Sequence, residues 1–267
     1  MKEIKKSIKL ECSICRNNKL DQVINLPSLP LTGIFVKEMP EKNSFSIDQG
    51  LNFCSECGHA QLMYVLDPSY VYGQTYYHRS TNSPISRSGN DFFLKFLRKV
   101  SFGRSFKKIL EVGCNDAYLL KNIQDMGEVL VGIDPILENN SSHAGEKIKL
   151  VGGFIEDTDF VSELGGTPDL ILSVHTFEHI DEPLPSLLEL VKNSSEDALF
   201  VIEVPGFDSL LNSFRFDQVF HQHIHYYSVA SFRRLIEIIG CEYLTHTFNY
   251  DFWRGTMLIA FQKNKKA

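Results

Sequence analysis

Residues 107–134 read KKILEVGCNDAYLLKNIQDMGEVLVGID, and this stretch decides the fold. A short apolar run ends at Gly113, a helical run continues to Gly127, and a second apolar run ends in Asp134. Gly127 is expected to stop the helix. Apolar strands that alternate with helices are typical of a parallel sheet covered on both faces. The stretch therefore predicts one strand–helix–strand unit of a doubly wound α/β fold.

The same alternation continues toward the C-terminal end. Further buried strands are expected to begin at residues 168 and 198, and a helix with an early proline lies between them. Ser228 is expected to cap another helix, and two strands end the chain as a pair. These patterns predict one mostly parallel sheet, whose later elements lie over residues 182–194, 198–206, 228–241, 241–250 and 255–263.

The composition limits the classes of function. The chain has 267 residues, 43% of them hydrophobic and 22% charged, with a formal net charge of −6. Because no basic patch is visible, we expect no nucleic-acid partner. No run of 18 apolar residues is present, so no membrane span is expected. The N-terminus lacks the apolar core of a secretory signal, so we expect a cytoplasmic protein that acts on a small-molecule substrate.

Four of the six cysteines form two Cys-x-x-Cys pairs, Cys12 with Cys15 and Cys54 with Cys57. Cytoplasmic thiols are expected to be reduced, so a bound metal explains the pairs better than disulfides do. Two pairs complete a closed four-thiolate shell, which is typical of structural zinc, and Gly58 suits the tight turn after the second pair. Four unrelated buried thiols are the alternative. We expect a small zinc-binding module at the N-terminal end.

The turn after residue 112 carries a cofactor-binding pattern. Asn115 and Tyr118 stand where the G-x-G-x-x-G motif of dinucleotide-binding proteins has its second and third glycines. The close backbone approach that a pyrophosphate needs is therefore missing. A single glycine, Gly113, with Glu111 two residues before it suits a ligand without phosphates, and Glu111 would face a cationic methionine group. The turn, including Asn115, predicts a site for S-adenosylmethionine.

A second acid supports this site. Asp134 follows Gly113 by 21 residues, close to the interval of about 20 expected for an acid that binds ribose hydroxyls. Phe154 is expected to contact adenine, with a plain core position as the alternative. A helix-flanking acid in a salt bridge is the alternative for Glu111, but its spacing from Asp134 favours the cofactor site for both acids.

These motifs resemble those of class I S-adenosylmethionine-dependent methyltransferases, and more closely the sugar C-methyltransferase family of deoxysugar biosynthesis. Members of that family begin with a four-cysteine zinc module, continue through a Tyr/Ser-rich segment and carry an E-x-G-x-N/D loop. The resemblance spans roughly residues 12–255 and lies in the segments CSIC, FCSECGHAQL, YYHRSTNSP, ILEVGCNDAYLL, VGIDP, HTFEHI and VFHQHIHYYS.

The resemblance implies a Rossmann-like fold in three parts. We expect a zinc-binding module over residues 1–65 and a Tyr/Ser-rich connecting segment with a helix over 66–105. The S-adenosylmethionine-binding methyltransferase domain is expected over 106–267.

Methyl transfer needs an aligned acceptor and a group that removes its proton. His221, His223 and His225 lie within five residues and would share one face of an extended strand. By resemblance, His223 matches the family's base and Tyr76 a tyrosine near the substrate, with His221 and Tyr77 as further candidates. A packed structural edge and a zinc site are the alternatives for the three histidines.

The HTFEHI segment, residues 175–180, follows another strand end. His175 and His179 would share one face if the segment is helical, and His175 and Phe177 are expected to line the cofactor pocket. Glu203 lies at the same edge of the predicted sheet, where it would hold a substrate hydroxyl or cap a turn.

We expect methyl transfer to a sugar or a small precursor of a surface polysaccharide of the capsule or O-antigen type. The expected substrate is a nucleotide-activated sugar or a capsule precursor. Oxygen is favoured over carbon, and a phosphoramidate decoration is included among the acceptors. C-methylation of a nucleotide-linked keto-deoxysugar is the alternative. An NAD-dependent sugar oxidoreductase and a non-catalytic zinc scaffold are alternatives of other classes. Two departures from the family bear on this expectation: Gln222 stands where the family has glutamate, and the family's C-terminal domain has no counterpart here.

Overall fold

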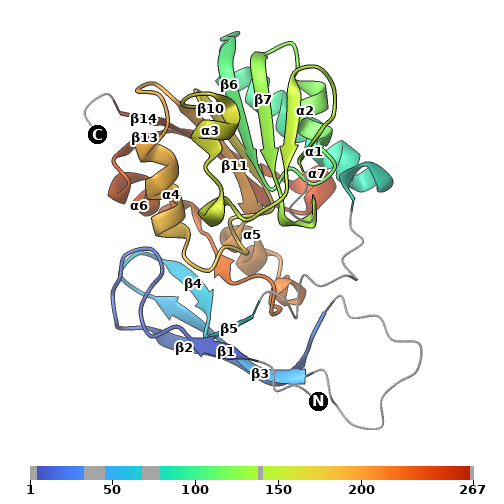
Figure 1. Ribbon diagram of the computed structural model, residues 1–267. Helices are drawn as coiled ribbons and strands as arrows, with labels where there is room; N and C mark the ends of the chain where they lie inside the picture. The colour runs from blue at the N-terminus through green and yellow to red at the C-terminus, as the bar shows by residue number, and fades with distance from the viewer. Residues whose placement is uncertain (1–4, 33–45, 68–78, 138–140, 265–267) are drawn as a thin grey trace.

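A central sheet of eight strands dominates the computed structural model, which describes residues 5–32, 46–67, 79–137 and 141–264 (Figure 1). The strand order is β13-β14-β11-β10-β6-β7-β9-β8. Neighbours from β11 to β9 are parallel, whereas β14, β13 and β8 pair antiparallel at the two edges. The doubly wound, mostly parallel α/β fold is therefore confirmed. The strands are β6 (Phe106–Val112), β7 (Gly127–Ile133), β8 (Ser141–His143), β9 (Ile148–Val151), β10 (Leu170–Val174), β11 (Leu199–Pro205), β13 (Cys241–Asn249) and β14 (Thr256–Lys263).

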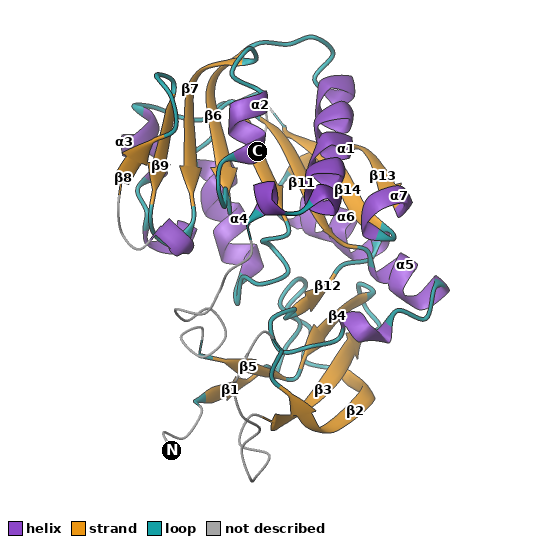
Figure 2. Cartoon of the chain, turned by 90° about the vertical axis from the view of Figure 1, so that its right-hand side faces the viewer, coloured by secondary structure: helices purple, strands orange, loops and turns teal. Residues whose placement is uncertain are grey.

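Helices cover both faces of this sheet (Figure 2). One hydrophobic cluster packs side chains of α1 (Pro84–Val100) and α2 (Tyr118–Asn122) against the sheet. A second cluster does the same on the other face with α3 (Phe160–Leu164), α4 (Pro183–Lys192) and α6 (Val229–Ile238). Shorter helices are α5 (Phe207–Asn212) and α7 (Tyr250–Trp253), with 3-10 turns η2 (Ser80–Asn82), η3 (Pro135–Leu137), η4 (Ile155–Asp157) and η5 (Phe216–Gln218).

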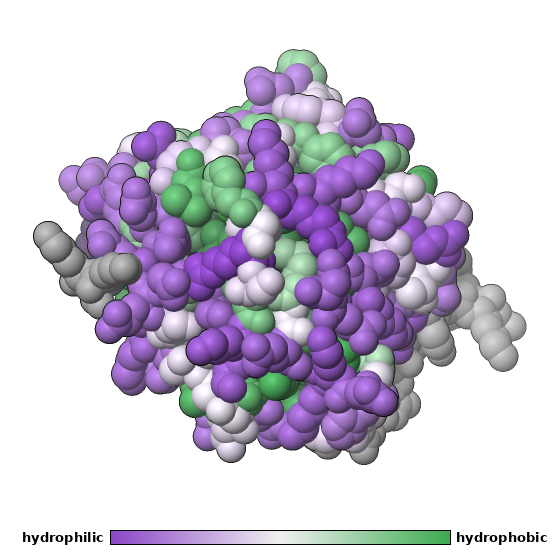
Figure 3. All heavy atoms as spheres, turned by 90° about the horizontal axis from the view of Figure 1, so that it is seen from above, coloured by the Kyte–Doolittle hydropathy of each residue, from purple (hydrophilic) through white to green (hydrophobic). Residues whose placement is uncertain are grey.

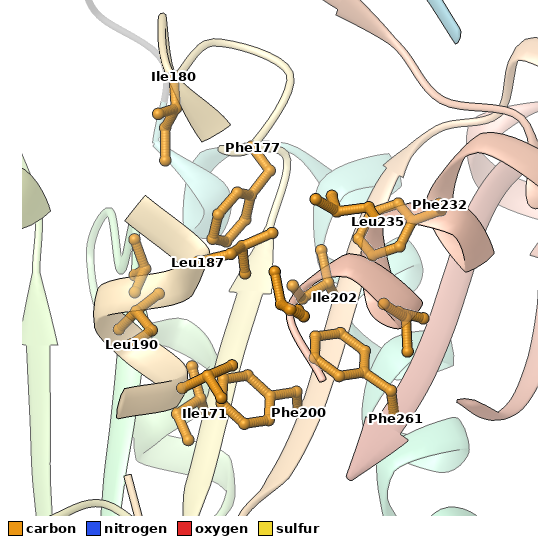
Figure 4. Packing of buried hydrophobic residues seen from close by; sticks show 14 of the residues in the cluster. Ile171, Phe177, Ile180, Leu187, Leu190, Phe200, Ile202, Phe232, Leu235 and Phe261 are labelled. Carbon is orange, nitrogen blue, oxygen red and sulfur yellow. The ribbon is translucent and has the colours of Figure 1, made fainter. Parts of the chain in front are cut away.

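Aromatic rings fill the second cluster. Phe200 of β11 and Phe261 of β14 stack with their centroids 4.8 Å apart, and Leu187 and Leu190 of α4 cover the same region (Figure 4). Burial of one such side chain stabilises the folded state by about 1.5–3 kcal/mol, so these residues hold α4 on the sheet.

The helix expected to run as far as Gly127 is shorter. α2 ends at Asn122, and Gly127 is the first residue of β7 rather than a helix stop. Ile123 and Met126 are buried in the core on this face, so the chain turns into the sheet before the helix can continue. A side chain at Gly127 would come within 2.6 Å of Ile109 Cδ1, so glycine is needed here for close strand packing.

Two C-terminal expectations are confirmed. The Ser228 side chain accepts a hydrogen bond from the Ser231 N–H, and the Ser231 Oγ accepts one from the Ser228 N–H, which makes a capping box at the start of α6. Residues 241–249 and 256–263 form the expected terminal strand pair, which is antiparallel and lies at the sheet edge.

A smaller antiparallel sheet precedes the main one in sequence, in the order β12-β4-β3-β2. Its strands β2 (Asp21–Pro30), β3 (Ser46–Cys54) and β4 (His59–Leu62) are N-terminal, but β12 (His225–Tyr226) comes from the main domain. His225 pairs with Gln61 and Tyr226 with Ala60. A two-stranded sheet of β1 (Lys6–Ile8) and β5 (Tyr64–Leu66) lies beside it (Figure 1). The small sheet therefore depends on a strand about 160 residues further along the chain.

The carboxyl ends of β6 and β7 point toward the small sheet (Figures 1 and 2). The opposite end of the molecule is mostly hydrophilic, with hydrophobic side chains only in scattered patches (Figure 3). Among the described residues, no helix has the length and apolar character needed to cross a membrane.

Candidate functional site

A cavity of about 1100 Å³ lies at the carboxyl ends of the parallel strands. Its walls come from the turns after β6, β7, β9 and β10, from α1 and α7, from the β1–β5 sheet, and from residues 218–224. Ligands of open α/β sheets bind at this edge, and the volume is at the upper end for a small-molecule site.

Two buried carboxylates lie at adjacent strand ends in this cavity. Glu111 in β6 is 2% exposed, and its Oε2 has no hydrogen-bond partner among the described residues. Asp134 follows β7, and its oxygens accept hydrogen bonds from the N–H groups of Asn115 (2.8 Å) and Ile136 (2.9 Å). Burial raises the pKa of both carboxyls, and the Asp134 charge raises the pKa of Glu111 further. The pair suits a ligand that carries a cation and hydroxyl groups.

Gly113, which lies between these two acids in the sequence, has a φ of +80°. Its N–H donates to the Ile133 carbonyl at 2.8 Å, and a Cβ on this residue would come within 1.9 Å of Thr176 Oγ1. Residue 113 must therefore be glycine for the turn to pack against the segment after β10.

The other expected cofactor residues divide into two groups. Asn115 and Phe154 line the cavity, and Phe154 is 44% exposed, so its ring can contact a planar ligand. Phe177 does not line it. Its side chain is fully buried in the core, close to Leu187 (Figure 4), and its carbonyl accepts a hydrogen bond from the Tyr227 hydroxyl at 3.1 Å. The expectation that Phe177 lines the pocket is therefore corrected, because the turn after β10 directs this ring into the sheet.

The segment after β10 is a turn, not the helix considered above. His175 has φ +52° and lies at the cavity wall, where its ring meets Trp253 edge-on at 4.6 Å. Its Nδ1 is 3.3 Å from Glu178 Oε1. Burial lowers the pKa of His175, but the Glu178 carboxylate more than offsets this and raises the pKa above its ordinary value.

The three histidines of residues 221–225 do not share one face, because the chain turns at residues 221–222 and only His225 is in a strand. His221 lies between Gln49 Nε2 (3.3 Å) and the Leu29 carbonyl (3.1 Å). His225 is fully buried, 3.1 Å from His59 Nε2, and does not line the cavity. His221 and His223 both line it.

His223 lies in a cluster with Glu178 and His179. Their ligand-type atoms lie within 4.8 Å of one another. His179 Nδ1 donates to the Gln222 carbonyl at 2.7 Å. Burial raises the pKa of Glu178, but His179 and His175 more than offset this and hold it at about 2. Burial and the adjacent His179 lower the pKa of His223 to about 3.

Sequence reasoning did not select Glu178. Its only signal was an acid between two histidines in HTFEHI. The Glu178 carbonyl accepts hydrogen bonds from the N–H groups of Ile224 (2.8 Å) and His225 (3.1 Å), which ties the two histidine-bearing segments together. Tyr76 and Tyr77 lie outside the described residues.

Glu203 lies in β11, fully buried, and does not line the cavity. Its Oε1 accepts a hydrogen bond from the Thr256 hydroxyl, and its Oε2 has no partner among the described residues. Burial raises the pKa of Glu203 to about 7, although His175 and Thr256 oppose the shift.

Glu203→Gln is expected to flatten the pH dependence of stability. The folded protein holds the proton of the Glu203 carboxyl more tightly than the unfolded chain does. The contribution of this carboxyl to stability is therefore complete below pH 4.5 and is lost as pH rises through 7. The loss is on the order of 3 kcal/mol. Urea unfolding of both proteins at pH 5 and pH 8 measures it. Equal pH dependence in the two proteins would contradict this assignment.

The four Cys-x-x-Cys thiols form a separate, closed cluster. The Sγ atoms of Cys12 and Cys57 are 3.6 Å apart, those of Cys15 and Cys54 are 3.5 Å apart, and all four lie within 4.8 Å of one another. Tetrahedral zinc–thiolate geometry places sulfur atoms about 3.8 Å apart, so the four thiols fit one zinc ion. None of them lines the cavity, as expected of a structural site.

The same turn follows each cysteine pair. Gly58 has φ +74° and its N–H donates to the Cys54 carbonyl, whereas Arg16 has φ +60° and its N–H donates to the Cys12 carbonyl, both at 2.9 Å. The repeated turn brings the two cysteines of each pair to the same side.

Two family models match the chain. The family described as "Methyltransferase domain" matches residues 85–246, which is more than half of the sequence. The family described as "Putative zinc binding domain" matches residues 12–72, which include all four cysteines of the cluster.

Curated relatives are similar over different lengths. The C-methyltransferase NovU of Streptomyces niveus is 25% identical over 239 residues, covering 86% of this chain and 55% of that protein. The ubiquinone biosynthesis O-methyltransferase of Vibrio campbellii is 29% identical over 114 residues, covering 39% of this chain and 48% of that protein. The chain thus spans about half the length of the curated relatives it matches.

Solved structures share the fold. The plantazolicin methyltransferase BpumL, solved with a monoazolic desmethylPZN analog and SAH, has a TM-score of 0.51 at 15% identity and matches 68% of this chain and 85% of its own. Magnesium protoporphyrin IX methyltransferase of Synechocystis PCC 6803 with bound SAH has a TM-score of 0.50 at 10% identity. The match covers 67% of this chain and 84% of that chain. At these identities the likeness concerns the fold alone.

Proposed function

Because the chain belongs to the methyltransferase-domain family, as an S-adenosylmethionine-dependent enzyme with an N-terminal zinc-binding module, we propose that it methylates a sugar or small precursor of a surface polysaccharide. The acceptor atom that we favour is a hydroxyl oxygen, including one on a phosphoramidate decoration. A nucleotide-activated sugar is the substrate form that we propose, and the cytoplasm, where the thiols stay reduced, is the compartment.

One observation carries this proposal. The two strand-end acids and the Glu178–His179–His223 cluster line the same cavity, so a donor and an acceptor can be held within reach of each other. We propose that Glu111 and Asp134 bind the ammonium and ribose hydroxyls of the donor. Gly113 and Asn115 form the floor of that site, and Phe154 contacts the adenine ring.

The reaction balances without a further reagent. A lone pair of the acceptor oxygen forms a bond to the methyl carbon, the carbon–sulfur bond breaks, and its electron pair stays on sulfur. The products are the methylated acceptor, S-adenosylhomocysteine and the proton of the acceptor hydroxyl. The chain must therefore align the two reactants, exclude water and release one proton.

His221 and His223 are our candidates on the acceptor side, with Tyr76 as a third from the resemblance. A pKa of about 3 makes His223 a weak base by itself. His175, whose pKa the Glu178 carboxylate raises, also lines the cavity.

C-methylation of a keto-sugar is the second candidate, supported by the similarity to a C-methyltransferase over 86% of this chain. Glutamine at residue 222 weighs against it, because the Gln222 amide cannot remove a proton from carbon. We also propose that the chain divides after residues 65 and 105 into a zinc-binding module, a connecting segment with a helix, and the methyltransferase domain.

Calorimetric titration with S-adenosylhomocysteine tests the donor site, and absence of binding would end the proposal. Incubation with a methyl-deuterated donor and pools of nucleotide sugars or capsule precursors, followed by mass spectrometry, tests the acceptor. A labelled methyl ether supports the oxygen acceptor, and a label on ring carbon supports the second candidate.

Gly113→Ala is expected to weaken S-adenosylhomocysteine binding at least tenfold, roughly 1.4 kcal/mol, because the new methyl group displaces Thr176 at the donor site. Gly103→Ala is the matched control, since Gly103 has φ +75° and no neighbour within 4 Å of its Cβ position. Because alanine would have a positive φ at either residue, both variants carry backbone strain of about 1–2 kcal/mol. Both should therefore have a lower melting temperature than the wild-type protein. Equal affinity in the two variants would show that the turn does not contact the donor.

A further inference from the structure

A second group of metal-binding side chains lies apart from the four cysteines. Glu178, His179 and His223 each offer one ligand atom, and the three atoms lie within 4.8 Å of one another. Two atoms bound to one zinc-sized ion are about 3–4 Å apart. His179 Nε2 is 3.7 Å from Glu178 Oε1, so only small movements separate the group from coordination geometry.

One hydrogen bond fixes the tautomer of His179. The carbonyl of Gln222 can only accept, so His179 Nδ1 carries the proton and Nε2 keeps a lone pair beside Glu178. Metal-binding histidines are commonly oriented by such a bond from the second ring nitrogen.

Two buried atoms of the group lack partners. Glu178 Oε2 and His223 Nδ1 have no hydrogen-bond partner among the described residues, and the Glu178 side chain is fully buried. A buried polar atom without a partner costs about 1–3 kcal/mol. A cation between the carboxylate and the two rings would satisfy both atoms.

The site is open on one side, unlike the cysteine cluster. All three residues line the large cavity, which leaves coordination positions free for water or substrate. Two histidines and one carboxylate with open positions are the donor set of catalytic divalent metals such as Fe²⁺ and Zn²⁺.

We infer that Glu178, His179 and His223 bind a divalent transition-metal ion whose open positions take the oxygen atom of the methyl acceptor. The identity of that oxygen rests on the proposed function, whereas metal binding itself does not. The ion favours the deprotonated acceptor, so the hydroxyl proton leaves to water before the oxygen attacks the methyl carbon. His223 then acts as a ligand rather than as the base.

The test uses the full chain loaded with zinc at the four cysteines and titrated with Co²⁺. We expect one further equivalent to bind, with the visible bands of a nitrogen–oxygen site and without the intense ultraviolet band of a thiolate site. Glu178→Gln and His179→Asn should each weaken this binding by at least about tenfold. His221→Asn is the matched control, because His221 lines the same cavity but bonds Gln49 and Leu29 instead.

The outcomes separate this inference from the proposed function. No Co²⁺ bound beyond the zinc in the wild-type chain, or full binding in both variants, overturns the metal site even if S-adenosylhomocysteine binds. Co²⁺ binding without S-adenosylhomocysteine binding keeps the metal site and removes the proposed function. Circular dichroism checks folding, and if either variant is unfolded the wild-type stoichiometry alone decides.

Discussion

Cys54→Ser is expected to remove the ion from the four-cysteine cluster and to unfold the small sheet. Cys54 is the last residue of β3 and is 1% exposed, so its thiolate joins the metal to the centre of that sheet. Structural zinc supplies folding free energy directly, on the order of 10 kcal/mol in small zinc domains. Loss of one of four ligands should therefore lower the melting temperature more than any surface change.

Zinc content by plasma mass spectrometry and the melting temperature measure this effect. Cys241→Ser is the matched control, because Cys241 is a half-buried cysteine of β13 outside the cluster. The control should keep its zinc. Unchanged zinc and melting temperature in Cys54→Ser would remove the assignment of the cluster as a structural metal site.

His223→Asn is expected to lower kcat by about 10²–10³ while S-adenosylhomocysteine affinity changes by no more than about twofold. His223 belongs to the acceptor side of the cavity, whereas the donor is assigned to the turns after β6 and β7. The loss follows whether the ring accepts a proton or binds a metal, since asparagine supplies neither function.

Single-turnover rates and calorimetry measure the two quantities separately. His246→Asn, which removes a partly buried histidine of β13 outside the cavity, is the control and should leave both near wild type. An equal loss of rate and donor affinity would assign His223 a structural role.

Local patterns predicted the features that depend on neighbouring residues. The apolar run before Gly113 and the acid at Asp134 predicted two strand ends, and parallel pairing of β6 with β7 brings Glu111 and Asp134 together. The two Cys-x-x-Cys pairs predicted a cluster because the two thiols of each pair are brought together within four residues. Ser228 capped its helix as expected for the same reason.

Features that depend on distant contacts were not predictable. The period of two in residues 221–225 suggested one shared face. Instead, the His221 ring bonds to Gln49, the His223 N–H donates to the Phe220 carbonyl, and the His225 ring bonds to His59. Phe177 is directed inward by packing against α4, and Glu178 gains its importance only when residues 175–180 and 221–225 meet. One sequence does not record such long-range contacts.

The pairing of β12 with β4 makes the two parts of the molecule mutually dependent during synthesis. When the ribosome has released only the first hundred residues, one edge of β4 has no partner, because His225 and Tyr226 are still to be made. An uncovered strand edge is a template for association with other chains. A fragment that ends before residue 220 should therefore aggregate in the cell, and supplying residues 79–267 as a second polypeptide should keep it in solution.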